Sequence, residues 1–246
     1  MNLFVHMGRY LLLMRHVFAR PQKGKIFRHQ LFDEFQNLGI DSLGIVAIIS
    51  VFMGAVVAMQ TAYNIDSPLI PLTMVGFTTR QSMILEFCPT IISLILAGKV
   101  GSRIASEIGT MRVTEQIDAL EVMGINPANY LIMPKVTASV LINPVLIILS
   151  MGVSIFGGWL ACVWTGMVTS TDFIYGLRYY FEGYAVFYAL VKTVVFAFLI
   201  SSISGYHGYS IEGGALEVGQ ASTRAVVHSS IFIIVFNLIL TRILLI

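Results

Sequence analysis

Five long apolar stretches constrain this chain more than any other feature of its sequence. Each is close to or longer than the roughly 20 residues that an α-helix needs to cross the hydrocarbon core of a bilayer. Inside a bilayer the backbone polar groups of a segment have to be satisfied within the protein, and a helix achieves this by itself. The pattern predicts an all-α integral membrane protein with about five transmembrane helices. They lie approximately at 42–62, 72–97, 134–165, 185–206 and 225–246.

The composition agrees with a membrane protein and excludes several other classes. The 246 residues are 57% hydrophobic and only 11% charged, whereas soluble domains have about a quarter of their residues charged. The net charge of +2 and the lack of basic runs interleaved with aromatic residues indicate no nucleic-acid partner. Cys88 and Cys162 lie in apolar runs and are interpreted as buried free thiols.

The segment before the first span has a different pattern. Residues 2–20 place their polar side chains on one helical face, and Arg15 and His16 are too costly for a transmembrane position. We expect an interfacial amphipathic helix that lies on the membrane surface, followed by a second amphipathic piece at about 26–38. Residues 1–38 would then be interfacial, and 42–246 would form the transmembrane core of a single domain over 1–246.

Lys and Arg residues predict the orientation in the membrane. They are concentrated before the first span and between the second and third spans, whereas the other side holds only Arg80, at a span edge, and Arg178. Because cytoplasmic loops carry an excess of Lys and Arg, we expect a cytoplasmic N-terminus and a cytoplasmic 98–133 loop. Five spans then place the C-terminus on the opposite side.

Proline and glycine residues inside the spans predict local geometry. Pro89 in the second span and Pro144 in the third indicate kinks or breaks. Gly152, Gly157 and Gly158 in the third span favour close approach of a neighbouring helix.

A polar island interrupts the apolar sequence at 97–127, AGKVGSRIASEIGTMRVTEQIDALEVMGINP. Within it, Thr114–Met123 alternates polar and apolar side chains at helical spacing, and Gly124 and Pro127 are typical of a helix end. This predicts a short amphipathic helix in the cytoplasmic loop. The pattern leaves two interpretations open, docking onto a soluble ATPase or a solvated surface helix. The candidate coupling residues are Glu107, Arg112, Glu115, Gln116, Asp118 and Glu121.

The chain lacks the motifs of an enzyme. It has no G-x-x-x-x-G-K-[ST] phosphate loop, no dinucleotide fingerprint and no His/Cys/Asp/Glu cluster with metal spacing. We therefore expect no catalytic residue, no metal site and no cofactor in this chain, and any energy has to come from a partner or an ion gradient.

Glu86 and Lys192 are charged residues that lie well inside the apolar spans. A charge at the bilayer centre costs roughly 2.5–3.5 kcal/mol on insertion scales, so Glu86 and Lys192 are expected to face the protein interior or a cavity. They could form a structural ion pair or line a polar cavity that receives a lipid headgroup. Gln60 and Tyr63, at the outer end of the first span, could line the same cavity or belong to the interfacial belt of aromatic residues.

The polar island resembles the signature of the MlaE (YrbE-type) family of ABC-transporter permeases of MCE-associated lipid transport systems. The similarity extends more loosely to Gln30–Gln60, to TRAVVHSS at 223–230 and to Lys192, where the family has an intramembrane Lys. Glu86 falls in a segment similar to the family's R-E-L-G-P pattern, which here is Leu85-Glu86-Phe87-Cys88-Pro89 without the Arg and the Gly.

The resemblance implies a function and partners. The island would contain the coupling helix, and ATP and Mg would be bound by a separate cytoplasmic ATPase subunit. The permease would form a homodimer in the bacterial inner membrane, beneath a ring of periplasmic MCE-domain proteins, and would move membrane lipid, with phospholipid as the expected class. Two alternatives remain, an ion-gradient-driven secondary transporter with Glu86 as proton relay and a membrane scaffold that transports nothing.

Overall fold

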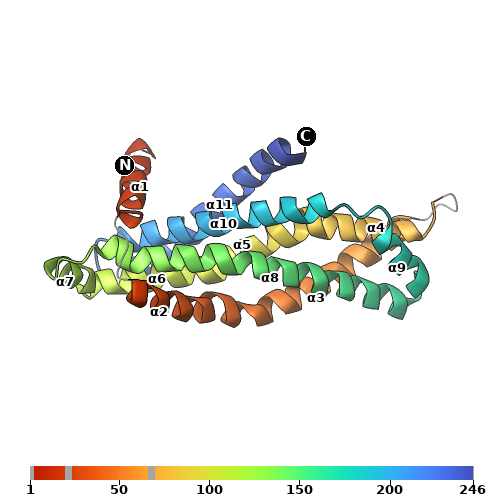
Figure 1. Cartoon of the computed structure of the whole chain (residues 1–246), viewed down its shortest axis with the longest axis horizontal. Coiled ribbons are helices and arrows are strands. Elements are labelled where there is room, and N and C mark those ends of the chain that lie inside the picture. Colours follow the sequence, from red (N-terminus) through yellow and green to blue (C-terminus); the bar gives the residue numbers. More distant parts are fainter. Residues whose placement is uncertain (1–2, 20–23, 66–69, 246) are drawn as a thin grey trace. The chain divides into compact units, whose positions relative to one another are not determined.

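The protein is helical throughout the part of the chain described by its structure, a computed structural model that covers residues 3–19, 24–65 and 70–245. Figure 1 labels the helices along the chain. No strand occurs among the described residues. In order, the elements are α1 Leu3–Val17, α2 Gly24–Glu34, η1 Phe35–Ile40, α3 Asp41–Asn64, α4 Thr73–Ser82, η2 Met83–Ile91, α5 Ile92–Leu96, η3 Ala97–Gly101, α6 Ser102–Val113, α7 Gln116–Val122, α8 Pro127–Thr165, α9 Ser170–Arg178, α10 Gly183–Tyr209 and α11 Ala215–Leu245.

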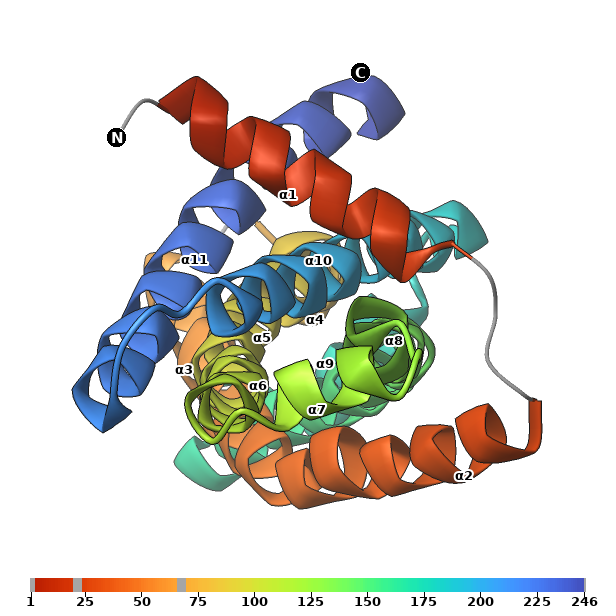
Figure 2. The ribbon, with the colours of Figure 1, turned by 90° about the vertical axis from the view of Figure 1, so that its left-hand side faces the viewer.

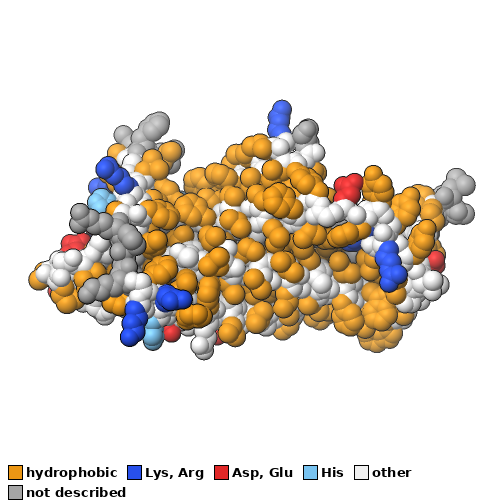
Figure 3. All heavy atoms as spheres, viewed as in Figure 1, with side chains coloured by type: hydrophobic (Ala, Val, Ile, Leu, Met, Phe, Trp, Pro, Cys, Tyr) orange, Lys and Arg blue, Asp and Glu red, His pale blue; other side chains and the backbone are white. Residues whose placement is uncertain are grey.

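Five continuous helical stretches are long and apolar enough to cross a membrane, and they confirm the predicted fold class. They are Gly24–Asn64, Thr73–Val113, Pro127–Thr165, Gly183–Tyr209 and Ala215–Leu245. Hydrophobic side chains predominate on the face seen in Figure 3, and charged side chains are few there.

The boundaries of the spans differ most from the predicted ones at two places. The helix of the second span continues through 98–113 in place of the expected loop, so 98–133 is largely helical. The piece predicted at 26–38 runs through the π-helical turn η1 into α3 without the expected gap. In both cases the prediction identified only the apolar part of the helix. The structure shows that the helix extends into the neighbouring polar residues.

The two prolines do not break their helices. Pro89 lies within η2, a π-helical segment, and Pro144 lies within the continuous helix α8. A π-helical turn accommodates the missing N–H of a proline because the regular i to i−4 bonding is already altered there. Of the two predicted alternatives, a kink or a break, the continuous helices exclude the break.

The chain forms two compact units, which share the long helices. One unit comprises 1–41, 93–143 and 194–246, and the other comprises 42–92 and 144–193. We call them the α1 unit and the α9 unit after a short helix that each contains.

In the α1 unit, α6 and α11 pack along each other, and α6 also contacts α10 closely. A Cβ on Gly208 of α10 would lie 2.7 Å from the carbonyl oxygen of Ala105. Ile104 and Ile108 of α6 are fully buried in this packing. Figure 2 shows α1 crossing α10, to which it is bonded through side chains.

In the α9 unit, α3 and α8 approach closely enough that their backbones touch. A Cβ on Gly54 would lie 1.8 Å from the carbonyl oxygen of Ser154, and one on Gly157 would lie 2.3 Å from that of Val51. The predicted close approach is confirmed at Gly157 and Gly158, whereas a Cβ on Gly152 meets nothing within 4 Å.

Both cysteines are buried as free thiols, as expected. Cys162 belongs to the small apolar core of the α9 unit with Ala58, Val75 and Phe173. Cys88 lies 3.4 Å from the hydroxyl oxygen of Ser154.

Candidate functional site

Glu86 and Lys192 form an ion pair within the α9 unit. The Nζ of Lys192 lies 2.9 Å from Oε1 of Glu86. The Lys192 side chain is fully buried, whereas 44% of the Glu86 side chain is exposed. From the sequence, these two residues could form an ion pair or line a cavity. In the structure they form an ion pair, and the Glu86 side chain remains partly exposed.

Other groups complete the environment of the Lys192 ammonium. It donates to the hydroxyl of Tyr188 at 3.0 Å and to the carbonyl oxygen of Leu85 at 3.3 Å. Tyr188 in turn donates to Glu86 at 3.4 Å, and Thr90 donates to the other carboxylate oxygen at 3.3 Å. The pair is therefore held by hydrogen bonds as well as charge, which a buried ion pair needs in order to offset its desolvation.

Tyr188 was not predicted as a member of this site. It precedes Lys192 by four residues on α10, so that both side chains share one helical face. That spacing was the available signal in the sequence.

Gln60 and Tyr63 lie elsewhere on the α9 unit. Both are exposed on α3, and the side chain of Tyr63 is 79% exposed. Among the contacts of the described residues, neither makes a hydrogen bond to Glu86 or Lys192. The structure thus unites two of the four predicted substrate residues and leaves the other two apart from them.

The predicted coupling helix is present as α7, with ends one to two residues inside the predicted ones. Glu115 precedes it with φ of 61°, and Gly124 follows it with φ of 73°. Both values lie in the left-handed region, which reverses the chain direction cheaply for glycine but at a cost for glutamate. Two tight corners therefore isolate α7 between α6 and α8.

Four of the six predicted coupling residues are bonded within the chain. Arg112 and Asp118 form an ion pair at 2.6 Å, and Tyr209 donates to Glu121 at 3.3 Å. Glu107 lies 2.8 Å from Lys135, which also pairs with Glu34. These residues stabilise the α1 unit whatever else they do.

Glu115 and Gln116 differ from those four. Both are exposed, and within the described part of the chain their side chains form no hydrogen bond or ion pair. Val122 and Met123, at the other end of α7, are 89% and 64% exposed. The surface of α7 thus offers an uncompensated carboxylate, an amide and two apolar side chains to a partner.

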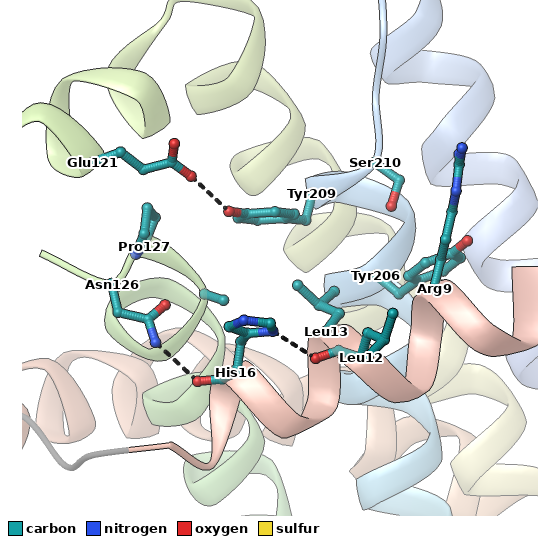
Figure 4. A pocket seen from close by; sticks show the side chains of 11 residues that line it. Arg9, Leu12, Leu13, His16, Glu121, Asn126, Pro127, Tyr206, Tyr209 and Ser210 are labelled. Carbon is teal, nitrogen blue, oxygen red and sulfur yellow. Dashed lines mark hydrogen bonds between the residues drawn. The ribbon is translucent and has the colours of Figure 1, made fainter.

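The α7–α8 connection and the first turn of α8 also hold the end of α1, which the sequence did not predict. Asn126 and Asn129 donate to the carbonyl oxygens of His16 and Val17, the last residues of α1. These bonds satisfy carbonyls that have no partner inside the helix. A groove of about 380 Å³ lies beside this contact, lined by α1, the α7–α8 connection and the end of α10 (Figure 4).

The other end of α1 is bonded to α10. His6 Nδ1 lies 2.9 Å from the Tyr206 hydroxyl, and Tyr10 donates to Ser202 at 2.9 Å. Burial raises the pKa of the Tyr10 phenol, and its hydrogen bond to Ser202 opposes that rise. α1 is therefore joined by side chains both to the region where α8 begins and to α10.

Comparison with known proteins decides the family. The family model "Permease MlaE" matches residues 31–243. The chain belongs to the MlaE permease family.

Relatives of this MlaE-family chain are described as transporter permeases. It is 39% identical over 217 residues to a probable ABC transporter permease protein of Rickettsia felis, covering 88% of this chain and 82% of that one. It is 31% identical over 245 residues to the intermembrane phospholipid transport system permease protein MlaE of Haemophilus influenzae, covering 99% and 93% of the two chains. The chloroplastic protein TRIGALACTOSYLDIACYLGLYCEROL 1 of Arabidopsis thaliana is also 31% identical, over 94% of this chain and 65% of its own length.

The family and the five apolar helices together assign the general role. This MlaE-family chain is an ABC-transporter permease and a multi-pass protein of the inner membrane.

Proposed function

We propose that this chain is the membrane subunit of an ATP-driven phospholipid transporter. It would move phospholipid between the inner membrane and a periplasmic MCE-domain partner, while a separate cytoplasmic subunit binds and hydrolyses ATP with Mg. The N-terminus and α7 would lie on the cytoplasmic side and the C-terminus on the periplasmic side. The name of the Haemophilus relative, which specifies phospholipid, supports the substrate class.

The observation that carries the proposal is the Glu86–Lys192 pair. Charged groups inside apolar helices are costly and commonly mark a substrate pathway. Lys192 is fully buried and Glu86 is 44% exposed, so the carboxylate is the member that a ligand can reach. A phospholipid headgroup carries a phosphate that Lys192 can attract and, in zwitterionic lipids, an ammonium group that Glu86 can attract. Transient exchange of these partners would let the site hold a headgroup and then release it.

Coupling to ATP hydrolysis would take place at α7. Glu115 and Gln116 are exposed at its start, and the charge of Glu115 is not compensated by another described residue. A short helix between two tight corners moves as one piece, and α6 and α8 continue from it into long apolar helices. Force applied to α7 by an ATPase would therefore reach the membrane-spanning parts directly.

A second copy of the chain would complete the transporter. α11 is the apolar helix with the least buried span, 11% against 61% for α10. Its exposed side chains include Phe232, Val235, Leu238 and Ile239. A symmetric homodimer would cover part of this surface.

The proposal is tested with the complex purified from native membranes and reconstituted in vesicles. We expect an ATPase subunit and an MCE-domain protein to co-purify, and we expect ATP to drive transfer of a labelled phospholipid. E115K should reduce both ATPase binding and transfer, whereas the control E182K, at an exposed glutamate of the α9–α10 connection, should reduce neither. Normal ATPase binding and transfer by E115K would overturn the assignment of α7. Transfer that ignores ATP and collapses with an uncoupler would favour a secondary transporter.

A further inference from the structure

Arg80 is a buried cation that ends in a cage of main-chain carbonyls. It lies on α4 in the α9 unit and is only 3% exposed. Its Nη1 donates to the carbonyl oxygens of Leu177 at 2.6 Å and Tyr179 at 3.0 Å, and its Nη2 donates to that of Tyr180 at 3.2 Å. No carboxylate of the described residues forms an ion pair with it. Burying the charge of an arginine within an apolar helix costs free energy. Its presence here therefore suggests a specific role.

Two aromatic rings and the carbonyls at the end of α9 provide favourable contacts for the Arg80 guanidinium. Its central carbon lies 5.1 Å from the ring centre of Phe77 and 5.5 Å from that of Phe181. The carbonyls that it binds belong to the last turn of α9 and the residues after it, where carbonyls lack partners inside the helix and carry partial negative charge. Arg80 thus acts as a cap that α4 provides to the end of α9.

The capped corner is strained at Tyr180. Its φ is 49°, in the left-handed region that side chains other than those of glycine, asparagine and aspartate seldom adopt. The Tyr180 side chain is 74% exposed, so packing of its ring contributes little to holding this conformation. Arg80 donates a hydrogen bond to the Tyr180 carbonyl, so it contacts the strained residue directly.

α4, which carries Arg80, and α9, whose end Arg80 caps, are closely fitted. A Cβ on Gly76 of α4 would lie 2.3 Å from the carbonyl oxygen of Phe173, and one on Gly176 of α9 would lie 2.0 Å from that of Thr73. α4 and α9 therefore have little freedom to slide, and any adjustment of the chain has to occur after α9.

The corner is connected along the chain to both members of the Glu86–Lys192 pair. Glu86 follows Arg80 by six residues in the same continuous helix, and α10, which carries Tyr188 and Lys192, begins at Gly183. The same two segments of the α9 unit are thus joined twice, once by Arg80 and once by the Glu86–Lys192 pair. A change at the first junction shifts the start of α10 and hence the geometry of the second.

We infer that Arg80 is a positioning residue, which holds the Tyr180 corner so that α10 places Lys192 against Glu86, the member of the pair that the lipid headgroup can reach. This inference rests on the proposed role of Glu86 and Lys192 in headgroup binding.

The test uses the reconstituted complex and four variants. R80A should keep ATPase binding and complex yield but lower lipid transfer about tenfold, since small misplacements of reacting or binding groups have effects at least this large. R80K should not restore transfer, because one ammonium cannot replace the planar fork and its stacking. In R80A/Y180G transfer should recover in large part, because glycine adopts the left-handed conformation without help. R178A, which removes the exposed neighbouring arginine, should behave like the unaltered chain.

The outcomes separate this inference from the proposed function. Normal transfer by R80A overturns the inference, and so does R80A/Y180G that remains as impaired as R80A. If R80A does not assemble, R80K and R80K/Y180G are compared in the same way, with recovery by the glycine expected and its failure contradicting the inference. Loss of transfer in E86Q and K192M with normal transfer in R80A leaves the proposed function intact and rejects only the role of Arg80. Normal transfer in E86Q and K192M rejects both.

Discussion

Lys192 is fully buried and lies 2.9 Å from a carboxylate oxygen of Glu86, whose side chain is 44% exposed. The two partners therefore have unequal positions. Lys192 depends on Glu86 for compensation of its charge, whereas Glu86 can be reached from outside the helix packing of the isolated chain.

This inequality predicts an asymmetric effect on stability. E86A leaves a buried cation without its carboxylate, a change that costs about 3–5 kcal/mol for a fully buried pair. K192M leaves a carboxylate that is partly accessible, so the loss should be smaller. In thermal unfolding of the purified chain in detergent, E86A should have a lower melting temperature than K192M. E86A/K192M should be more stable than E86A alone. The reverse order for the single variants would show that Glu86 is the dependent partner.

The Arg112–Asp118 pair separates the internal role of α7 charges from their role toward a partner. Its side chains are 34% and 54% exposed, and pairs of this kind contribute only about 0–1 kcal/mol to stability. The exchange R112D/D118R should preserve the pair and the thermal stability of the chain. It should nevertheless weaken ATPase binding, measured by co-purification, because the charges presented on α7 are rearranged. Unchanged binding would assign both residues a purely internal role.

Lys135 should be the most sensitive charged residue of the α1 unit. Its side chain is 3% exposed and lies between the carboxylates of Glu34 and Glu107. K135M leaves two neighbouring carboxylates without a cation, so a loss of about 3–5 kcal/mol is expected. E107Q should cost much less, because Glu107 is 45% exposed and Lys135 keeps Glu34. Equal melting temperatures for the two variants would contradict the central position of Lys135.

Glycine substitutions test the contact between α3 and α8. G54A would place a methyl group 1.8 Å from the Ser154 carbonyl oxygen, so the helices have to separate. Overpacking of this kind costs about 1–3 kcal/mol or more. G152A is the matched control, since its methyl group meets nothing within 4 Å and alanine favours a helix. We expect a lower yield of folded protein for G54A alone, as measured by size-exclusion chromatography in detergent.

The membrane fold could be predicted from the sequence because long apolar stretches leave few alternatives to helices. The extent of the second helix could not. Residues 98–113 carry charges that indicate a loop by composition, but several of these charges are compensated within the chain. Lys99 donates to the carbonyl of Asp41, Arg103 pairs with its carboxylate at 3.0 Å, and Glu107 pairs with Lys135. Such pairing depends on distant segments and leaves no local pattern.

The candidate site could also be predicted only in part. Glu86 and Lys192 were found because charges are rare in apolar helices, and α7 was found because its spacing and end signals are local. The role of Arg80 was not found, since its partners are main-chain carbonyls, which every residue possesses. The strain at Tyr180 was hidden for the related reason that tyrosine gives no sign of a left-handed backbone.

One measurement tests the central claim most directly. ATP-driven transfer of a labelled phospholipid would be followed in vesicles that contain the complete complex with the unaltered chain, E86Q, K192M or, as a control outside the site, E182K. The account predicts that E86Q and K192M bind the ATPase subunit normally yet transfer lipid at least about tenfold more slowly, which corresponds to a loss of ~1.4 kcal/mol or more, while E182K is unaffected. Transfer by E86Q and K192M at the rate of the unaltered chain would contradict it.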